Sequence, residues 1–80
     1  MIDHVALDPN SPTALYQQLA ELLRGQIESG KLTGRVPSAK GLAQEHGVAV
    51  GTAERALRIL REDGLIVSAS GRGHFTVERP

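Results

Sequence analysis

Three glycines, Gly30, Gly47 and Gly64, each follow a stretch whose apolar residues recur every three or four positions. That spacing is the periodicity of an amphipathic helix, and glycine readily adopts the left-handed backbone with which many helices end. We therefore expect three short helices. Eighty residues suffice for one small domain, so these helices must share a single core.

The first helix is expected to begin at Ser11 and Pro12 and to run to about Ser29. Serine is a favourable cap, and proline fits the first turn because it has no backbone N–H to leave unpaired. Apolar side chains at helical spacing predict one buried stripe on this helix. The stripe consists of Leu15, Leu19, Leu22, Leu23 and Ile27.

The second and third helices are expected to meet at a sharp corner. Ser38 can cap the second helix, which is barely two turns long and ends at Gly47, and Val48 would fill the corner. The third helix should run from about Val50 to Asp63. Its apolar arc consists of Ala53, Ala56, Leu57 and Leu60, and its opposite face of Gly51, Arg55, Arg58 and Glu62. This is a helix-turn-helix pattern.

After Gly64 the period changes to that of strands. The runs "LIVSA" and "HFTVE" are rich in β-prone residues, and "SGRG" between them predicts the turn of a hairpin. The expected fold is thus mainly α, with some β structure: a winged helix-turn-helix domain over residues 11–78, with three helices followed by a β-hairpin wing. Residues 1–10 are expected to form a tail or a short strand.

Several function classes fit the composition poorly. The absence of cysteine excludes disulfides and thiolate metal sites, and the separated His4, His46 and His74 predict neither a metal site nor a cofactor. No nucleophile and base are arranged for catalysis, so we do not expect an enzyme. No apolar run is long enough for a membrane span, and the acidic N-terminal residues do not resemble a signal peptide, which favours the cytoplasm.

Charge alone leaves two interpretations open. Nine basic and nine acidic residues cancel over the chain, but from Lys31 to Arg61 six basic residues accompany only two acidic ones. Such a basic middle can attract a phosphate backbone, and it can equally be an ordinary solvated surface. Only two residues, Tyr16 and Phe75, are aromatic, too few for the stacking platform that single-stranded nucleic acid requires.

Several segments together closely resemble one family. They are "ALYQQLAELLRGQIESGKL", "VPSAKGLAQEHGVAVGTAERALRILREDGLIV" and "GRGHF", in this order and over about residues 12–77. The chain resembles the DNA-binding domain of GntR-family bacterial transcription regulators. The resemblance implies a winged helix that binds operator DNA as a homodimer, with the third helix in the major groove and the wing on the adjacent minor groove.

The resemblance also implies which residues meet DNA. Lys40 stands where the family usually has a phosphate-contacting arginine, and Thr52 where a hydroxyl meets phosphate. Val50 and Glu54 replace the family's usual arginines, and Ala49 replaces its polar cap, so base reading would differ from the family pattern. The residues predicted to contact duplex DNA are Ser38, Lys40, Val50, Gly51, Thr52, Glu54, Arg55, Arg58, Gly71, Arg72, Gly73 and His74.

Alternatives remain for individual residues and for the whole domain. For Arg58, surface ion pairs to Glu54 and Glu62 are the favoured alternative to a DNA contact, whereas for Arg55 a role at DNA is favoured. His74 can meet phosphate or simply begin a strand. A rival hypothesis is a winged helix that binds another protein, which the neutral net charge favours. No effector site is visible in these residues, and the direction of regulation is most simply repression.

Overall fold

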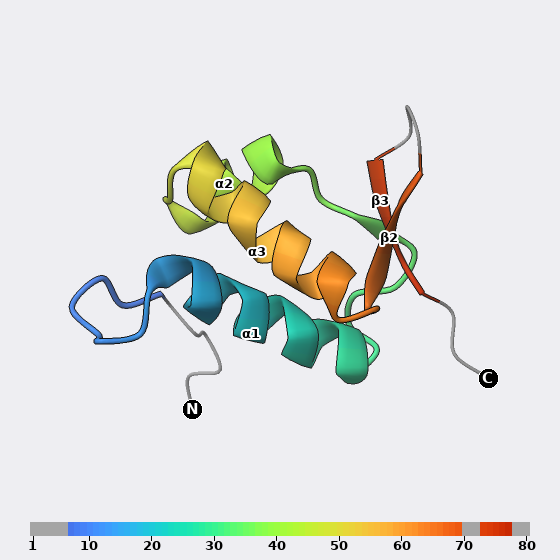
Figure 1. The fold of residues 1–80 in the computed structure, drawn as a ribbon, viewed down its shortest axis with the longest axis horizontal. Coiled ribbons are helices and arrows are strands. Elements are labelled where there is room, and N and C mark those ends of the chain that lie inside the picture. Colours follow the sequence, from blue (N-terminus) through green and yellow to red (C-terminus); the bar gives the residue numbers. More distant parts are fainter. Residues whose placement is uncertain (1–6, 70–72, 78–80) are drawn as a thin grey trace.

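The computed structural model describes residues 7–69 and 73–77, and it has the predicted architecture. Three helices are followed by a hairpin, and a short additional strand precedes the second helix, so the sheet has three strands (Figure 1). The elements are α1 Leu15–Glu28, β1 Arg35–Val36, α2 Ala39–His46, α3 Val50–Glu62, β2 Ile66–Ala69 and β3 Gly73–Thr76. None of the helices in these residues is long and apolar enough to cross a membrane.

The predicted start of the first helix is wrong by about one turn. α1 begins at Leu15 and its cap is Ala14, which makes no side-chain hydrogen bond. Ser11 instead stabilises a turn before the helix, where its Oγ accepts a hydrogen bond from the Thr13 N–H at 3.1 Å. Serine oxygens cap turns as well as helices, and the sequence pattern is the same for both.

The residues just before α1 are attached to it through Gln18. Its side-chain Oε1 accepts a hydrogen bond from the Asp8 N–H at 2.7 Å, and its Nε2 donates to the carbonyl oxygens of Asp8 and Thr13. Leu7 packs against the edge of the core. Residues 7–10, predicted as part of a tail or short strand, thus form an ordered turn against α1.

The core lies where the three helices and the sheet converge. The predicted inward arc of α3 is fully buried, and α1 contributes Leu19 and Leu23 together with Ala20, which the periodicity did not single out. Leu15, Leu22 and Ile27 of the predicted stripe are only half-buried. Among residues 7–69 and 73–77, the buried residues are Leu19, Ala20, Leu23, Val36, Leu42, Ala43, Ala53, Ala56, Leu57, Leu60, Leu65 and Ile66.

The corner between α2 and α3 forms as the sequence predicts. Ser38 caps α2 by accepting a hydrogen bond from the Gly41 N–H at 3.0 Å. Gly47 ends the helix with φ of 68°, in the left-handed region, and the next N–H, of Val48, bonds to the Ala43 carbonyl oxygen. The left-handed Gly47 and the Val48 bond therefore form the corner at which the chain turns from α2 into α3.

The sheet is antiparallel, with β3 between β1 and β2. Val36 pairs with His74 and Ser68 pairs with His74 from the other side, while Phe75 lies between Arg35 and Val67. The two-residue β1 is held further by Gly34, whose N–H donates to the Thr76 side chain at 2.8 Å. These contacts attach the base of the hairpin to the helical core.

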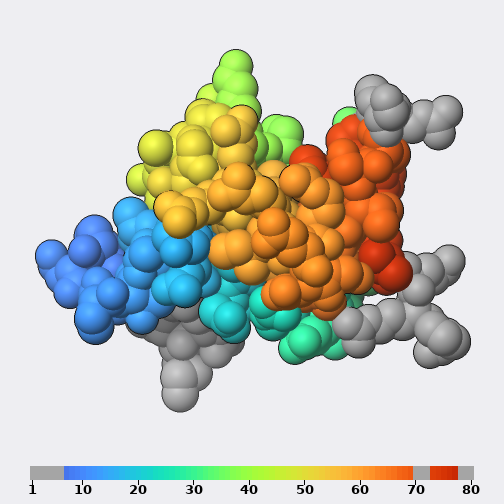
Figure 2. All heavy atoms as spheres, in the orientation of Figure 1, coloured from blue at the N-terminus to red at the C-terminus, as the bar shows by residue number. Residues whose placement is uncertain are grey.

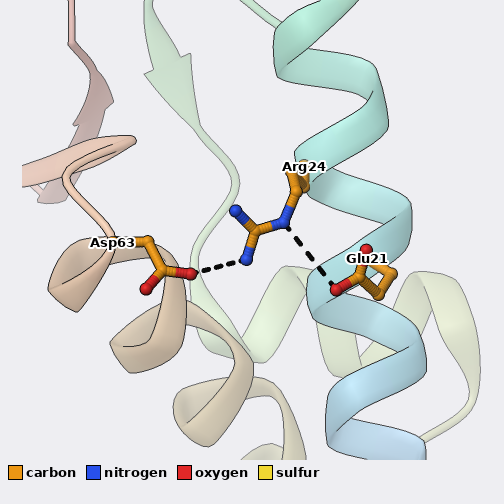
Figure 3. Close-up of polar contacts among 3 residues, drawn as sticks. All are labelled: Glu21, Arg24 and Asp63. Carbon is orange, nitrogen blue, oxygen red and sulfur yellow. Dashed lines mark hydrogen bonds and ion pairs between the residues drawn. The ribbon is translucent and has the colours of Figure 1, made fainter.

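A surface ion pair joins the ends of α1 and α3. Arg24 Nη2 donates to an oxygen of the Asp63 carboxylate at 2.5 Å, and Arg24 Nε lies 3.8 Å from Glu21 (Figure 3). The hydrogen bond to Asp63 raises the pKa of the Arg24 guanidinium above its ordinary value. The pair links the first helix to the residue that ends the third.

Candidate nucleic-acid interface

The site begins with the exposed face of α3. Figure 2 shows the yellow-to-orange surface of this helix running between α1, in blue and cyan, and the strands, in orange and red. Burying the alanine and leucine arc on one side leaves the opposite side in solvent. The predicted residues on this face, Val50, Gly51, Glu54, Arg55 and Arg58, are all exposed, and Thr52 is half-buried.

The start of α3 has hydrogen-bond donors available. Its cap is Ala49, which offers no side-chain acceptor, and its first turn has no acidic residue. Within the described residues, the backbone N–H groups of Val50, Gly51 and Thr52 donate to no acceptor. The positive end of a helix dipole with free donors attracts anions such as phosphate.

The two predicted surface ion pairs of Arg58 do not form. In the described part of the chain, neither Glu54 nor Glu62 lies within 4.0 Å of its guanidinium, although each is one helical turn away. Arg58 is exposed, and its donors remain available on the same face as Arg55. The surface-pair interpretation of Arg58 therefore receives no support from the geometry.

The residues predicted on α2 lie at its exposed start. Lys40 is exposed in the first turn, and Ser38 uses its Oγ to accept the capping bond, which leaves its hydroxyl proton free to donate. The α2 start and the α3 start both belong to the helix-turn-helix unit. Its outer surface thus carries one lysine, two arginines and one glutamate among the predicted contact residues.

The wing is described only in part. Gly71 and Arg72, predicted at its tip, lie outside the described residues. Gly73 begins β3 with φ of 95°, a conformation that suits glycine, and it is exposed. His74 is the second residue of this strand, close to the alternative that it begins one, and its Nε2 lies 3.3 Å from Nη1 of Arg61 in the last turn of α3. This contact connects the wing base to the third helix.

Two residues near this face were not predicted as part of it. Arg35 in β1 is exposed beside the wing, since a Cβ added to Gly73 would lie 3.8 Å from its Nη2. Tyr16 in α1 lies under Arg55, whose Cζ is 4.0 Å from the centre of the ring. The place of Arg35 beside Gly73 depends on the pairing of β1 with β3. The Tyr16 contact depends on how α1 crosses α3, which no local pattern specifies.

A groove lies apart from these residues. It has a volume of about 760 Å³ and runs between the end of α1 and β3, with Ile27, Leu32, Phe75 and Val77 among its lining residues. Phe75, one of the two aromatic residues, thus lies at the rim of the core rather than inside it. None of the predicted DNA-contacting residues that the structure describes lines this groove. Nor does any cluster of potential metal ligands occur in the described residues.

Comparisons with curated proteins and solved structures give a consistent result. The histidine utilization repressor of Pseudomonas aeruginosa is 39% identical over 69 residues, which are 84% of this chain and 28% of the repressor. The chain covers between 14 and 31% of the length of each curated relative that it matches.

Two solved structures show the same fold. YtrA from Sulfolobus acidocaldarius, a GntR-family transcription factor, superimposes with a TM-score of 0.84 and 28% identity, over 95% of this chain and 82% of YtrA. The DNA-binding domain of AraR, solved in complex with operator ORE1, gives a TM-score of 0.73 and 31% identity over 78% of each chain.

The family model of the bacterial regulatory proteins, gntR family, matches residues 15–76, which include all the helices and strands that the structure describes. The relatives named above are a repressor and a transcription factor, in line with the expectation of a regulator rather than an enzyme. The resemblance noted in the sequence is therefore confirmed, and the chain belongs to the gntR family of bacterial regulatory proteins.

Proposed function

We propose that this domain binds duplex DNA with sequence preference and regulates transcription, most simply as a repressor that occludes a promoter. In this proposal α3 enters the major groove and the wing, including Arg72 at its tip, meets the adjacent minor groove. Such a regulator would act in the cytoplasm. Two copies would bind the two halves of an operator, because a homodimer matches the symmetry of a palindromic site.

One observation carries the proposal: the outer face of α3 is exposed and bears two arginines, Arg55 and Arg58, without an intramolecular ion pair in the described residues. An arginine that forms no such pair keeps its donors for guanine or phosphate. The uncapped start of the same helix adds free N–H groups. The family relatives named as repressors and the operator complex of AraR support the same assignment.

Base reading would depart from the pattern implied by the family. Val50, 44% exposed, offers an apolar surface that suits the methyl group of thymine, and Glu54 can accept a hydrogen bond from the amino group of cytosine. Glu54 also repels phosphate. Docking positions that place its carboxylate beside a phosphate therefore bind more weakly than they would with a neutral residue at 54. We therefore propose that Val50, Glu54 and Arg55 together determine which operator sequence is bound.

Salt dependence tests this proposal. Fluorescence anisotropy with duplexes selected from a random pool should show binding that weakens steeply between 50 and 200 mM salt, because phosphate contacts release counterions. Arg72→Ala should weaken binding to all duplexes alike and make the salt slope shallower by about 1. Glu62→Ala, on the last turn of α3, is a charge-changing control that should not weaken binding. Failure to retain any duplex at low salt would contradict the proposal.

A protein-binding winged helix is the second candidate. The zero net charge and the absence of arginine at positions 50 and 54 favour it, since a DNA-binding surface is usually basic. The same anisotropy experiment separates the two. A protein-binding domain would show weak association with DNA that does not distinguish selected from scrambled duplexes.

A further inference from the structure

The guanidinium of Arg55 rests on an aromatic ring from another helix. Its Cζ lies 4.0 Å above the centre of the Tyr16 ring, well within the range of a cation–π contact. Tyr16 is half-buried in the first turns of α1, whereas Arg55 is exposed on α3. The ring is thus anchored by the packing of α1 against α3, and the arginine it holds remains open to solvent.

The contact uses the face of the guanidinium and leaves its edge free. All five N–H donors of arginine lie in the plane of the group, so stacking on a ring engages none of them. In the described residues, Arg55 makes no hydrogen bond or ion pair. Arg24 and Arg61 differ, because their edges donate to Asp63 and contact His74.

We propose that Tyr16 is a positioning residue that holds Arg55 ready for DNA. The ring fixes the plane of the guanidinium so that its edge meets two adjacent acceptors on the duplex, either O6 and N7 of a guanine or two oxygens of one phosphate. This inference rests on the proposed function. It extends the DNA-reading apparatus from the helix-turn-helix unit to α1, and it gives Arg55 a role that its neighbour Arg58, with no ring beneath it among the described residues, does not share.

The expected effect follows from the loss of this support. A cation–π contact at an exposed site corresponds to about two- to fivefold in an equilibrium constant, and an arginine that is free before binding loses more conformational entropy on the duplex. Tyr16→Leu, which keeps an apolar side chain on α1, should therefore weaken duplex binding by about two- to tenfold. Tyr16→Phe keeps the ring and should bind as the wild type does.

A double-mutant cycle on the 80-residue chain tests the coupling. Anisotropy is measured with a selected duplex for Tyr16→Leu in the wild-type, Arg55→Ala and Arg58→Ala backgrounds, after circular dichroism has shown that each variant is folded. Tyr16→Leu should have no further effect once Arg55 is alanine, and its full effect when Arg58 is alanine. A loss confined to duplexes with one particular G·C pair identifies guanine as the acceptor, whereas a uniform loss identifies phosphate.

The free protein provides a second readout. The side-chain δ protons of Arg55 should be shifted upfield in NMR spectra by the ring current of Tyr16 in the wild type and in Tyr16→Phe, but not in Tyr16→Leu. The inference is overturned if Tyr16→Leu weakens the Arg55→Ala variant as much as the wild type, if Tyr16→Phe is as weak as Tyr16→Leu, or if the wild type lacks the shift. A wild type that binds no duplex overturns the proposed function and this inference together.

Discussion

The uncapped start of α3 can be given the cap that α2 already has. The backbone at Ala49 has φ of −68° and ψ of 150°, almost the same as the −68° and 162° at Ser38, whose Oγ accepts from the third residue of its helix. A serine at 49 therefore needs no backbone change to accept from the Thr52 N–H. A new N-cap bond stabilises a protein by about 1 kcal/mol.

Ala49→Ser should accordingly raise the melting temperature by about 4–8 °C for a domain of this size. Thermal unfolding followed by circular dichroism measures the change. Ser38→Ala is the matched control and should lower the melting temperature by a similar amount, because it removes the observed bond to Gly41. If Ser38→Ala destabilises the domain while Ala49→Ser leaves its melting temperature unchanged, similar backbone angles at the two positions are not sufficient for a serine cap.

An aspartate at the same position separates stability from DNA binding. Ala49→Asp should stabilise the fold at least as well as serine, since a negative charge also favours the helix N-terminus. It should nevertheless weaken duplex binding by about fourfold, the effect of a like charge about 5 Å from a phosphate in water. Duplex binding as tight as that of the wild type would mean that the start of α3 does not face the phosphates.

Four further substitutions test the fold. Gly47→Ala should cost about 1 kcal/mol in urea unfolding through backbone strain alone, because nothing lies within 4 Å of the added Cβ, whereas Gly51→Ala, within α3 and without positive φ, should stabilise the domain. Asp63→Asn, which removes the ion pair to Arg24, should cost at most about 1 kcal/mol, and the loss should shrink at high salt. Leu60→Ala, fully buried, should cost about 2–5 kcal/mol in the same assay.

The ends and buried faces of most helices could be predicted from the sequence, because they depend on contacts between residues only a few positions apart. Gly47 and Ser38 determine the ends of α2 through contacts within four positions, and the apolar arc of α3 was predicted completely. The start of α1 was not, because Ser11 can cap a turn as well as a helix and only tertiary contacts such as those of Gln18 decide between them. Local sequence patterns therefore do not show whether the serine caps a turn or a helix.

The residues of the candidate site were predicted where they follow from one helix, and missed where they depend on contacts between elements. The exposed positions of α3 follow from its helical period, so Arg55 and Arg58 were placed correctly on its outer face. The contact of Arg55 with Tyr16 joins residues 39 positions apart and depends on the crossing of two helices. The position of Arg35 beside Gly73 likewise depends on sheet pairing.

The central claim is that the outer face of α3 is the surface that meets duplex DNA. An NMR titration of the ¹⁵N-labelled domain with a selected duplex tests it most directly. If this face meets the duplex, the largest amide shifts fall at residues 50–58, with smaller ones at the start of α2 and in the wing. Shifts confined to the groove beside Ile27 and Phe75, with the amides of α3 unmoved, would contradict it.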